Sequence, residues 1–136
     1  ASEKMAHDVL EISNKPVVVS HTGLKGVCNT PRNFPDDLMK KIAEAGGVIA
    51  LGFWDAAACD PTPAGIAKSI KYGVDLVGAD HIALGSDWDG ATRSITADEI
   101  GEITQELLNL ELSHAVIRKV MGENSLAFLA KSLPNE

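Results

Sequence analysis

Three short apolar runs, separated by segments with the apolar spacing of helices, constrain the fold of this chain more than any other feature. The runs read PVVVSH (residues 16–21), VIALG (48–52) and HIALGSD (81–87). Short runs rich in Val, Ile and Leu are typical of strands buried on both faces, and such strands occur in parallel sheets covered by helices. The alternation therefore predicts an α/β fold in which right-handed crossover helices connect parallel strands.

The segments around these runs carry the start and stop signals of helices. Thr96 and Glu99, for example, form a possible capping box. The last helix is expected to bury Leu126 and Leu129, whereas residues 53–63 are expected to form a long loop. Helices are expected over residues 2–13 and 33–47, from the cap Thr62-Pro63 to Val77, from Thr96 to Leu110, and after the cap Ser113, and a last helix is expected to start at Asn124.

The size of the chain limits how much of a parallel α/β fold it can build. A complete (β/α)8 barrel takes about 250 residues, and this chain has 136. No linker or low-complexity segment divides residues 1–136, so we expect a single domain or fragment. The expected fold is the C-terminal part of a TIM-like barrel, with three parallel strands and flanking helices. Its two unpaired sheet edges predict self-association.

The charge balance and the length of the apolar runs exclude several classes of partner. The chain has 12 Lys and Arg against 19 Asp and Glu, a formal net charge of −7, which argues against nucleic acid or an anionic membrane surface as a partner. No apolar run is long enough to span a membrane. The charged, amphipathic first twelve residues rule out a secretory signal within this stretch. The sequence leaves the cellular compartment open.

Ionisable side chains follow two of the three predicted strands. In parallel α/β folds the functional groups gather at the carboxyl ends of strands, where His21 and Asp87 stand. Taken alone, His21 could equally be a structural histidine, and Asp87 could cap a turn. Arg32, before the next helix, would alone be a solvated or packing arginine. Together the three suit a site that binds a metal, a carboxylate and a polar or protonated group.

The remaining histidines are not candidates for this site, and the residues that follow the middle strand are expected only to shape the side of a pocket. His7 and His114 fall on helices and are expected at the surface, and His81 lies at the opposite end of its strand. Phe53 and Trp54 follow the middle strand and could shape the side of a pocket.

Three longer motifs resemble the membrane (renal) dipeptidase family of zinc peptidases. They are PVVVSHTG with CNTPRNFPDDLMKKIAEAGGVI, then GADHIALGSDWDG, then GENSLAFL, and they span essentially all 136 residues. The family has the same order of a Ser-His strand end, an Arg-Asn loop, an acidic turn and a Gly-x-Asn helix start. Trp88 stands here where the family turn has Phe. The resemblance implies a (β/α)8 barrel that holds two zinc ions at its mouth and hydrolyses dipeptides.

The resemblance also implies a role for each candidate residue. His21 matches a zinc-binding histidine, and a neutral imidazole is a good zinc ligand. Arg32 matches the arginine that grips the substrate carboxylate, for which a guanidinium fork is suited. Asp87 matches the catalytic aspartate near the substrate amine and the attacking water. Two zinc ions would lower the pKa of a bridging water and polarise the scissile carbonyl.

Other residues that the family requires would lie upstream of the strand at residues 16–21. They are a His-x-Asp pair, a bridging glutamate, a further substrate-contacting histidine and another zinc histidine. We therefore expect a fragment of a zinc dipeptidase that is inactive alone because its metal site is incomplete. The alternatives are a non-catalytic metal- or ligand-binding half-barrel, a structural remnant, or a fragment of another metal-dependent barrel hydrolase.

The two cysteines lie in loops that follow adjacent strands. Cys28 and Cys59 would be on the same rim, so a disulfide between them is geometrically possible. An oxidising compartment would favour the disulfide, and a reducing one would leave two free thiols. The sequence leaves both outcomes open.

Overall fold

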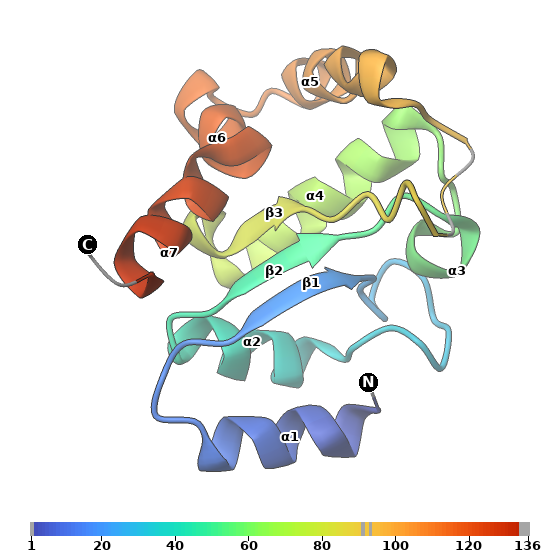
Figure 1. Cartoon of the computed structure of the whole chain (residues 1–136). Helices are drawn as coiled ribbons and strands as arrows, with labels where there is room; N and C mark the ends of the chain where they lie inside the picture. The colour runs from blue at the N-terminus through green and yellow to red at the C-terminus, as the bar shows by residue number, and fades with distance from the viewer. Residues whose placement is uncertain (1, 91, 93, 134–136) are drawn as a thin grey trace.

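A computed structural model describes residues 2–90, 92 and 94–133, and it shows one parallel sheet with helices around it (Figure 1). The sheet has the order β1-β2-β3, and both strand pairs are parallel. The predicted α/β fold with three parallel strands is thereby confirmed. The elements are α1 (Glu3–Ile12), β1 (Val18–Thr22), α2 (Asp36–Glu44), β2 (Val48–Leu51), α3 (Asp55–Ala58), α4 (Pro63–Val77), β3 (Ile82–Leu84), α5 (Ile100–Asn109), α6 (His114–Arg118) and α7 (Asn124–Ser132).

One face of the sheet packs on helices and forms the main core. Ile49 and Leu51 of β2 and Ile82 of β3 are 0 to 1% exposed and lie in one cluster with side chains of α2, α4 and α5. In Figure 1, α2 lies beside β1, and α4 lies behind the sheet. Burying this much apolar surface is the main driving force for folding. The helical partners are Leu38, Met39, Ile42, Ile66, Ile70, Ile103 and Leu107.

The other face of the sheet carries a smaller cluster of small side chains. Val48, Ala50 and Ala83 form a second buried cluster, and the half-buried Phe128 of α7 packs against it. Strand residues alternate between the two faces, so β2 and β3 send every second side chain to this side. The cover on this face therefore comes mainly from one helix near the carboxyl end of the described chain.

The helices begin where their caps predict. Thr62 accepts a hydrogen bond from the Gly65 N–H at 3.2 Å, and Pro63 begins α4. The capping box of Thr96 and Glu99 is present, although the helix starts with a 3-10 turn at Ala97–Glu99. Thr62 also donates from its hydroxyl and its backbone N–H to the Asp60 carboxylate, which lowers the pKa of Asp60 below its usual value.

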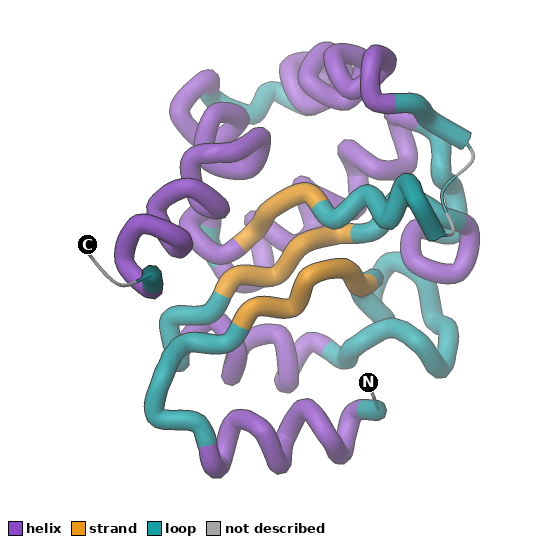
Figure 2. The backbone as a smooth tube through the Cα atoms, in the orientation of Figure 1, coloured by secondary structure: helices purple, strands orange, loops and turns teal. Residues whose placement is uncertain are grey.

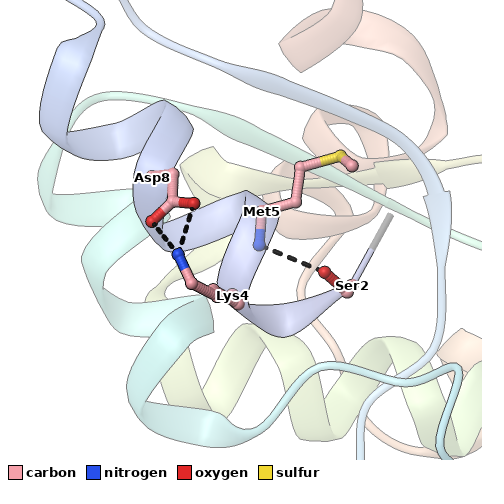
Figure 3. A network of polar contacts seen from close by, with 4 residues as sticks. All are labelled: Ser2, Lys4, Met5 and Asp8. Atoms are coloured by element: carbon pink, nitrogen blue, oxygen red, sulfur yellow. Dashed lines mark hydrogen bonds and ion pairs between the residues drawn. The ribbon is translucent and has the colours of Figure 1, made fainter.

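Helix α1 has surface contacts at its start and packs on the core only through the half-buried Ala6 and Leu10. The Ser2 hydroxyl accepts from the Met5 N–H at 3.2 Å, and Lys4 pairs with Asp8 at 2.8 Å (Figure 3). None of its residues is buried, and Met5 and Val9 are 55% and 36% exposed. An amphipathic helix normally buries such residues, so in this chain α1 has an apolar side that its own neighbours only partly cover.

Two expectations from the sequence are wrong. The segment expected as a loop over residues 53–63 contains the short helix α3. Leu126 and Leu129 are 69% and 50% exposed rather than buried, because α7 turns Asn124 and Phe128 toward the sheet instead. Helical spacing identified the helix but not the side that faces the core.

The three strands end on the same side of the molecule. Figure 2 shows the loops that follow β1, β2 and β3 gathered at one end of the sheet. In the part of the chain that the structure describes, none of the helices has both the length and the apolar character needed to cross a bilayer.

Candidate functional site

His21 is an exposed residue near the carboxyl end of β1, where its ring has two neighbours. The Ser20 hydroxyl lies 2.9 Å from His21 Nδ1, and the imidazole ring centroid lies 5.8 Å from that of Trp54, at an interplanar angle of 62°. A hydrogen bond at one ring nitrogen fixes the orientation of an imidazole and leaves the other nitrogen for a ligand. With Nδ1 engaged by Ser20, Nε2 is the nitrogen that His21 can offer.

The chain after β3 approaches the end of β1 very closely. A Cβ atom built on Gly85 would lie 2.5 Å from the Ser20 carbonyl oxygen and 3.1 Å from His21 Cα, so only glycine fits without movement of the backbone. The Gly85 N–H also donates to the Leu51 carbonyl at 2.9 Å. The ends of the first and third strands therefore converge, which is what a common site for His21 and Asp87 requires.

Arg32 lies in the segment of residues 23–35 that connects β1 to α2, here named the Arg32 loop. Its guanidinium carbon is 4.5 Å from the centroid of the Trp54 ring. A guanidinium over an indole ring is attracted by the negative face of the ring. Trp54 is thus in contact with both His21 and Arg32, which brings two of the three predicted site residues together.

A cavity of about 240 Å³ opens between α1 and β1 and reaches these residues. His21 and Arg32 line one part of it, and apolar residues of α1 such as Met5 and Val9 line another. Pockets that bind small molecules commonly combine an apolar wall with a few polar groups.

Asp87 lies in the turn after β3, and its backbone has an unusual conformation. Its φ of 58° is in the left-handed region, and its carbonyl accepts from Gly90 N–H at 3.1 Å and Thr92 N–H at 3.2 Å. Asp tolerates this region better than most residues. The half-buried side chain lies against Gly90, where a Cβ atom would be 2.6 Å from Asp87 Oδ1. The backbone of Asp87 therefore shapes the turn, and its carboxylate is at the same end of the sheet as His21.

Trp88, next to Asp87, connects this turn to Ile95 and Phe53. Its indole N–H donates to the Ile95 carbonyl at 2.9 Å, and its ring lies 6.1 Å from that of Phe53 at 71°. Phe53 is fully buried beside Trp54. Both aromatic residues that follow β2 thus contact segments that carry predicted site residues. From the sequence these two residues were predicted only to shape the side of a pocket.

Asn33 holds the Arg32 loop in place, and the sequence analysis did not identify it. Its side chain is 1% exposed, and its amide donates to the Cys28 carbonyl at 2.7 Å and to the Ala57 carbonyl at 3.0 Å. Thr30 also donates to the Ala56 carbonyl at 2.9 Å. These bonds join the Arg32 loop to residues 52–59, here named the Trp54 segment. The family motif contains an Arg-Asn pair at this position, and this pair was the one feature of the sequence that could have identified Asn33.

The disulfide that the sequence left open is present. Cys28 in the Arg32 loop is bonded to Cys59 in the Trp54 segment, with 5.3 Å between their Cα atoms. Cys28 is fully buried. The disulfide adds a covalent connection between the two segments that the side chains of Thr30 and Asn33 already join.

A tyrosine supports the Arg32 loop from α4. The Tyr72 hydroxyl donates to Asp36 Oδ2 at 2.6 Å, and this bond, with desolvation of the phenol, raises the pKa of Tyr72 above its usual value. A Cβ atom on Gly26 would lie 2.0 Å from the same hydroxyl oxygen, so the loop backbone passes directly against it.

The remaining histidines have surroundings that fit the sequence analysis. His81 Nδ1 lies 2.9 Å from the Gly47 carbonyl, at the opposite end of the sheet from His21. His114 is exposed at the start of α6, and His7 is half-buried on α1.

The described residues do not complete a metal site by themselves. Within residues 2–90, 92 and 94–133, no group of three or more His, Cys, Asp or Glu side chains is arranged to hold a metal ion. A catalytic zinc commonly takes three protein ligands, and here His21 offers one imidazole while both cysteines are in the disulfide. A metal at this position would need ligands in addition to those that the described chain provides.

Comparison with known proteins gives a consistent relationship. Residues 1–132 match the family model described as membrane dipeptidase (peptidase family M19). An uncharacterized protein in the pqqA 5′ region of Klebsiella pneumoniae is 32% identical over 109 residues, which are 75% of this chain and 39% of that protein. Dipeptidase verJ of Clonostachys rogersoniana is 32% identical over 126 residues, which are 87% of this chain and 32% of the relative.

Comparison with a solved structure shows that the similarity includes the fold. The crystal structure of a metallo peptidase from Rhodobacter sphaeroides, liganded with a phosphinate mimic of the dipeptide L-Ala-D-Ala, matches this structure with a TM-score of 0.81 at 23% identity. The match covers 96% of this chain and 40% of that chain. This chain therefore spans about a third to two-fifths of the length of these relatives, and the fold agrees with the predicted part of a barrel. On the match over residues 1–132, the chain belongs to the membrane dipeptidase family.

Proposed function

We propose that this chain supplies part of the active site of a zinc-dependent dipeptidase. In this proposal His21 binds a metal ion through Nε2, Arg32 binds the free carboxylate of the dipeptide, and Asp87 lies near its amine. The observation that carries the proposal is that His21 and Arg32 line one cavity and contact the same indole ring. The R. sphaeroides relative is a metallo peptidase that was solved with a dipeptide mimic, which supports the substrate class.

Each residue contributes a binding or orienting step that its surroundings allow. Arg32 can bind a carboxylate through two parallel N–H donors, which fixes one end of a dipeptide. The Asp87 carboxylate can accept a hydrogen bond from the ammonium at the other end. Orienting both ends positions the peptide bond for attack, a contribution that can be large in enzymes. Zinc, when bound, would supply a polarised carbonyl and a water of lowered pKa.

We further propose that the described residues do not hydrolyse dipeptides without the rest of a barrel. One imidazole is too few ligands for a stable catalytic zinc, and the matches to this chain cover only 39% and 32% of the two relatives. The alternative is a half-barrel that binds a metal or ligand without catalysis. Isothermal titration of this chain with zinc distinguishes the two, since tight stoichiometric binding would favour the alternative.

The active-site proposal is tested in the full-length protein with zinc and the dipeptide L-Ala-D-Ala. Arg32→Ala is expected to lower kcat/KM roughly 10- to 150-fold, because hydrogen bonds to a charged group are worth about 1.5 to 3 kcal/mol. Arg118→Ala is the matched control, since Arg118 is exposed and pairs only with Glu123 at 3.2 Å among the described residues. Equal effects of the two variants, or no hydrolysis by the unaltered protein, would contradict the proposal.

Self-association remains part of the proposal for the chain on its own. The outer edge of β1 is unpaired within the described residues, and Val18 on this strand is 48% exposed. Unpaired strand edges favour pairing with another chain. Sedimentation of the chain should show a species larger than a monomer, and a clean monomer would contradict this part.

A further inference from the structure

The Arg32 loop and the Trp54 segment form one cross-linked unit. A disulfide, the Thr30 hydroxyl and the Asn33 amide connect them. A Cβ atom on Gly23 would lie 2.2 Å from the Ala57 carbonyl oxygen, so the two backbones are also in close contact. Figure 1 shows α3 beside the loop that leaves β1. Arg32 therefore extends from a loop whose backbone is fixed relative to Trp54.

The indole of Trp54 is itself held firmly. It is 9% exposed, and a Cβ atom on Gly52 would lie 2.1 Å from its Cζ3 atom, which means that the ring lies directly on the backbone at Gly52. The Trp54 carbonyl accepts from the N–H groups of Ala57 and Ala58 at 2.9 and 3.0 Å, which fixes the start of α3. A side chain packed in this way has little rotamer freedom, so it offers a rigid surface to its neighbours.

The contact of Arg32 with Trp54 differs from an ion pair because it leaves the N–H donors of the guanidinium available. A guanidinium has five N–H donors, all in the plane of the group, and stacking uses only its face. A carboxylate partner would occupy some of these donors and compete with a bound carboxylate. None of the five ion pairs among the described residues includes Arg32. The 4.5 Å contact thus orients the side chain and keeps its donors free.

We propose that Trp54 is a positioning residue that holds the face of the Arg32 guanidinium and so presents its N–H edge to the free carboxylate of a dipeptide. This inference rests on the proposed function of Arg32. It predicts that loss of the indole weakens recognition of the carboxylate specifically, and that another flat ring at position 54 restores it in part.

The first test compares a dipeptide with its C-terminal amide in the full-length protein. The ratio of kcat/KM for L-Ala-D-Ala to that for L-Ala-D-Ala amide measures recognition of the carboxylate. Trp54→Leu is expected to lower this ratio about two- to fivefold, the size of a cation–π contact at an exposed guanidinium, mainly through KM. Trp54→Phe should lower it less. In an Arg32→Ala background, Trp54→Leu should change the ratio no further.

The matched control is Phe128→Leu, which also removes an aromatic ring but lies on α7 against the small-residue face of the sheet. It should leave the ratio unchanged. If Trp54→Leu leaves the ratio unchanged, the proposal is overturned. An equal loss of kcat/KM for the acid and the amide would in addition show that the role of Trp54 is merely structural.

A second test does not depend on activity. In a protein labelled with ¹⁵N-arginine, the Nε–H signal of Arg32, assigned by its loss in Arg32→Lys, should be shifted upfield by the indole ring and return toward the random-coil position in Trp54→Leu. An Arg32 signal that is the same in both proteins overturns the contact. If the signal moves as expected but the unaltered protein does not hydrolyse dipeptides, the function proposed for the site is wrong, whereas the positioning of Arg32 by Trp54 is confirmed.

Discussion

At each end of the sheet a buried asparagine donates hydrogen bonds to two backbone carbonyls. The two ends differ in the other contacts that join the same segments. At the carboxyl ends of the strands, Asn33 bonds to the carbonyls of Cys28 and Ala57. At the opposite end, Asn124 bonds to the carbonyls of Ala79 and Ile82 at 2.6 and 2.8 Å. Loops and helix ends leave backbone carbonyls without regular partners, and an amide NH₂ can satisfy two of them at once.

Only the end that carries the candidate site adds a covalent connection. The disulfide joins the same two segments as Asn33. At the opposite end, α7 follows Asn124 and turns Leu126 and Leu129 outward. The Arg32 loop and the Trp54 segment are thus joined by a disulfide as well as by an amide, whereas the start of α7 is joined to its neighbours by the Asn124 amide and the Phe128 ring. Three predictions test this contrast.

Removal of the disulfide should have the largest effect on stability. Cys28→Ser with Cys59→Ser is expected to lower the free energy of unfolding by roughly 3 kcal/mol, because a disulfide between residues 31 apart restricts the unfolded chain. Urea unfolding of the chain measures this loss. A reducing agent should destabilise the unaltered chain by a similar amount and leave the double variant unchanged. Equal stability of the two proteins would show that the disulfide does not hold this end.

The two asparagines should have intermediate effects on stability that differ in their coupling to the disulfide. Asn33→Ala and Asn124→Ala each remove two hydrogen bonds to backbone carbonyls, at a cost of about 2 kcal/mol. Removal of the disulfide should change the effect of Asn33→Ala but leave that of Asn124→Ala the same within about 0.5 kcal/mol, because only Asn33 shares its partners with the disulfide. A double-mutant cycle measured by urea unfolding tests this.

The exposed Asn109 provides a control for these two substitutions. Its side chain accepts from Gln105 at 3.1 Å on the surface of α5. Asn109→Ala should therefore change the free energy of unfolding by less than about 0.5 kcal/mol. Equal coupling of Asn33 and Asn124 to the disulfide would mean that the two ends are not held independently.

The outward leucines of α7 should have the smallest effect. Leu126→Ser or Leu129→Ser is expected to change the free energy of unfolding by less than about 0.5 kcal/mol, because both side chains are already in contact with solvent. Thermal unfolding at two protein concentrations measures this. A loss of more than 1 kcal/mol that grows with concentration would show that a second copy covers these residues.

Much of the fold could be predicted from local signals. The apolar runs located all three strands, and Thr62, Thr96 and Ser113 cap helices where the sequence placed the caps. The third strand is shorter than the run that predicted it, Ile82–Leu84 within residues 81–87. Local patterns define elements well, whereas the extent of a strand depends on which neighbour it pairs with.

The candidate site was only partly accessible to sequence reasoning. His21, Arg32 and Asp87 could be named from strand ends and from the resemblance, and their roles stay predictions. The contact of His21 with Trp54, the contact of the same indole with Arg32 and the hydrogen bond of Asn33 to Ala57 each join residues from two different segments. No spacing within one segment carries information about such contacts, because they depend on how the segments pack.

The sequence by itself determined the alternation of strands and helices, the parallel arrangement, the caps and the family resemblance, since each depends on residues that are close together in the chain. The tertiary structure decided which side of α7 faces the sheet, that Cys28 and Cys59 are bonded, and that one indole contacts both His21 and Arg32. Folding brings these groups together because burial of the strands and helices fixes where each loop ends, and only then can distant side chains come into contact.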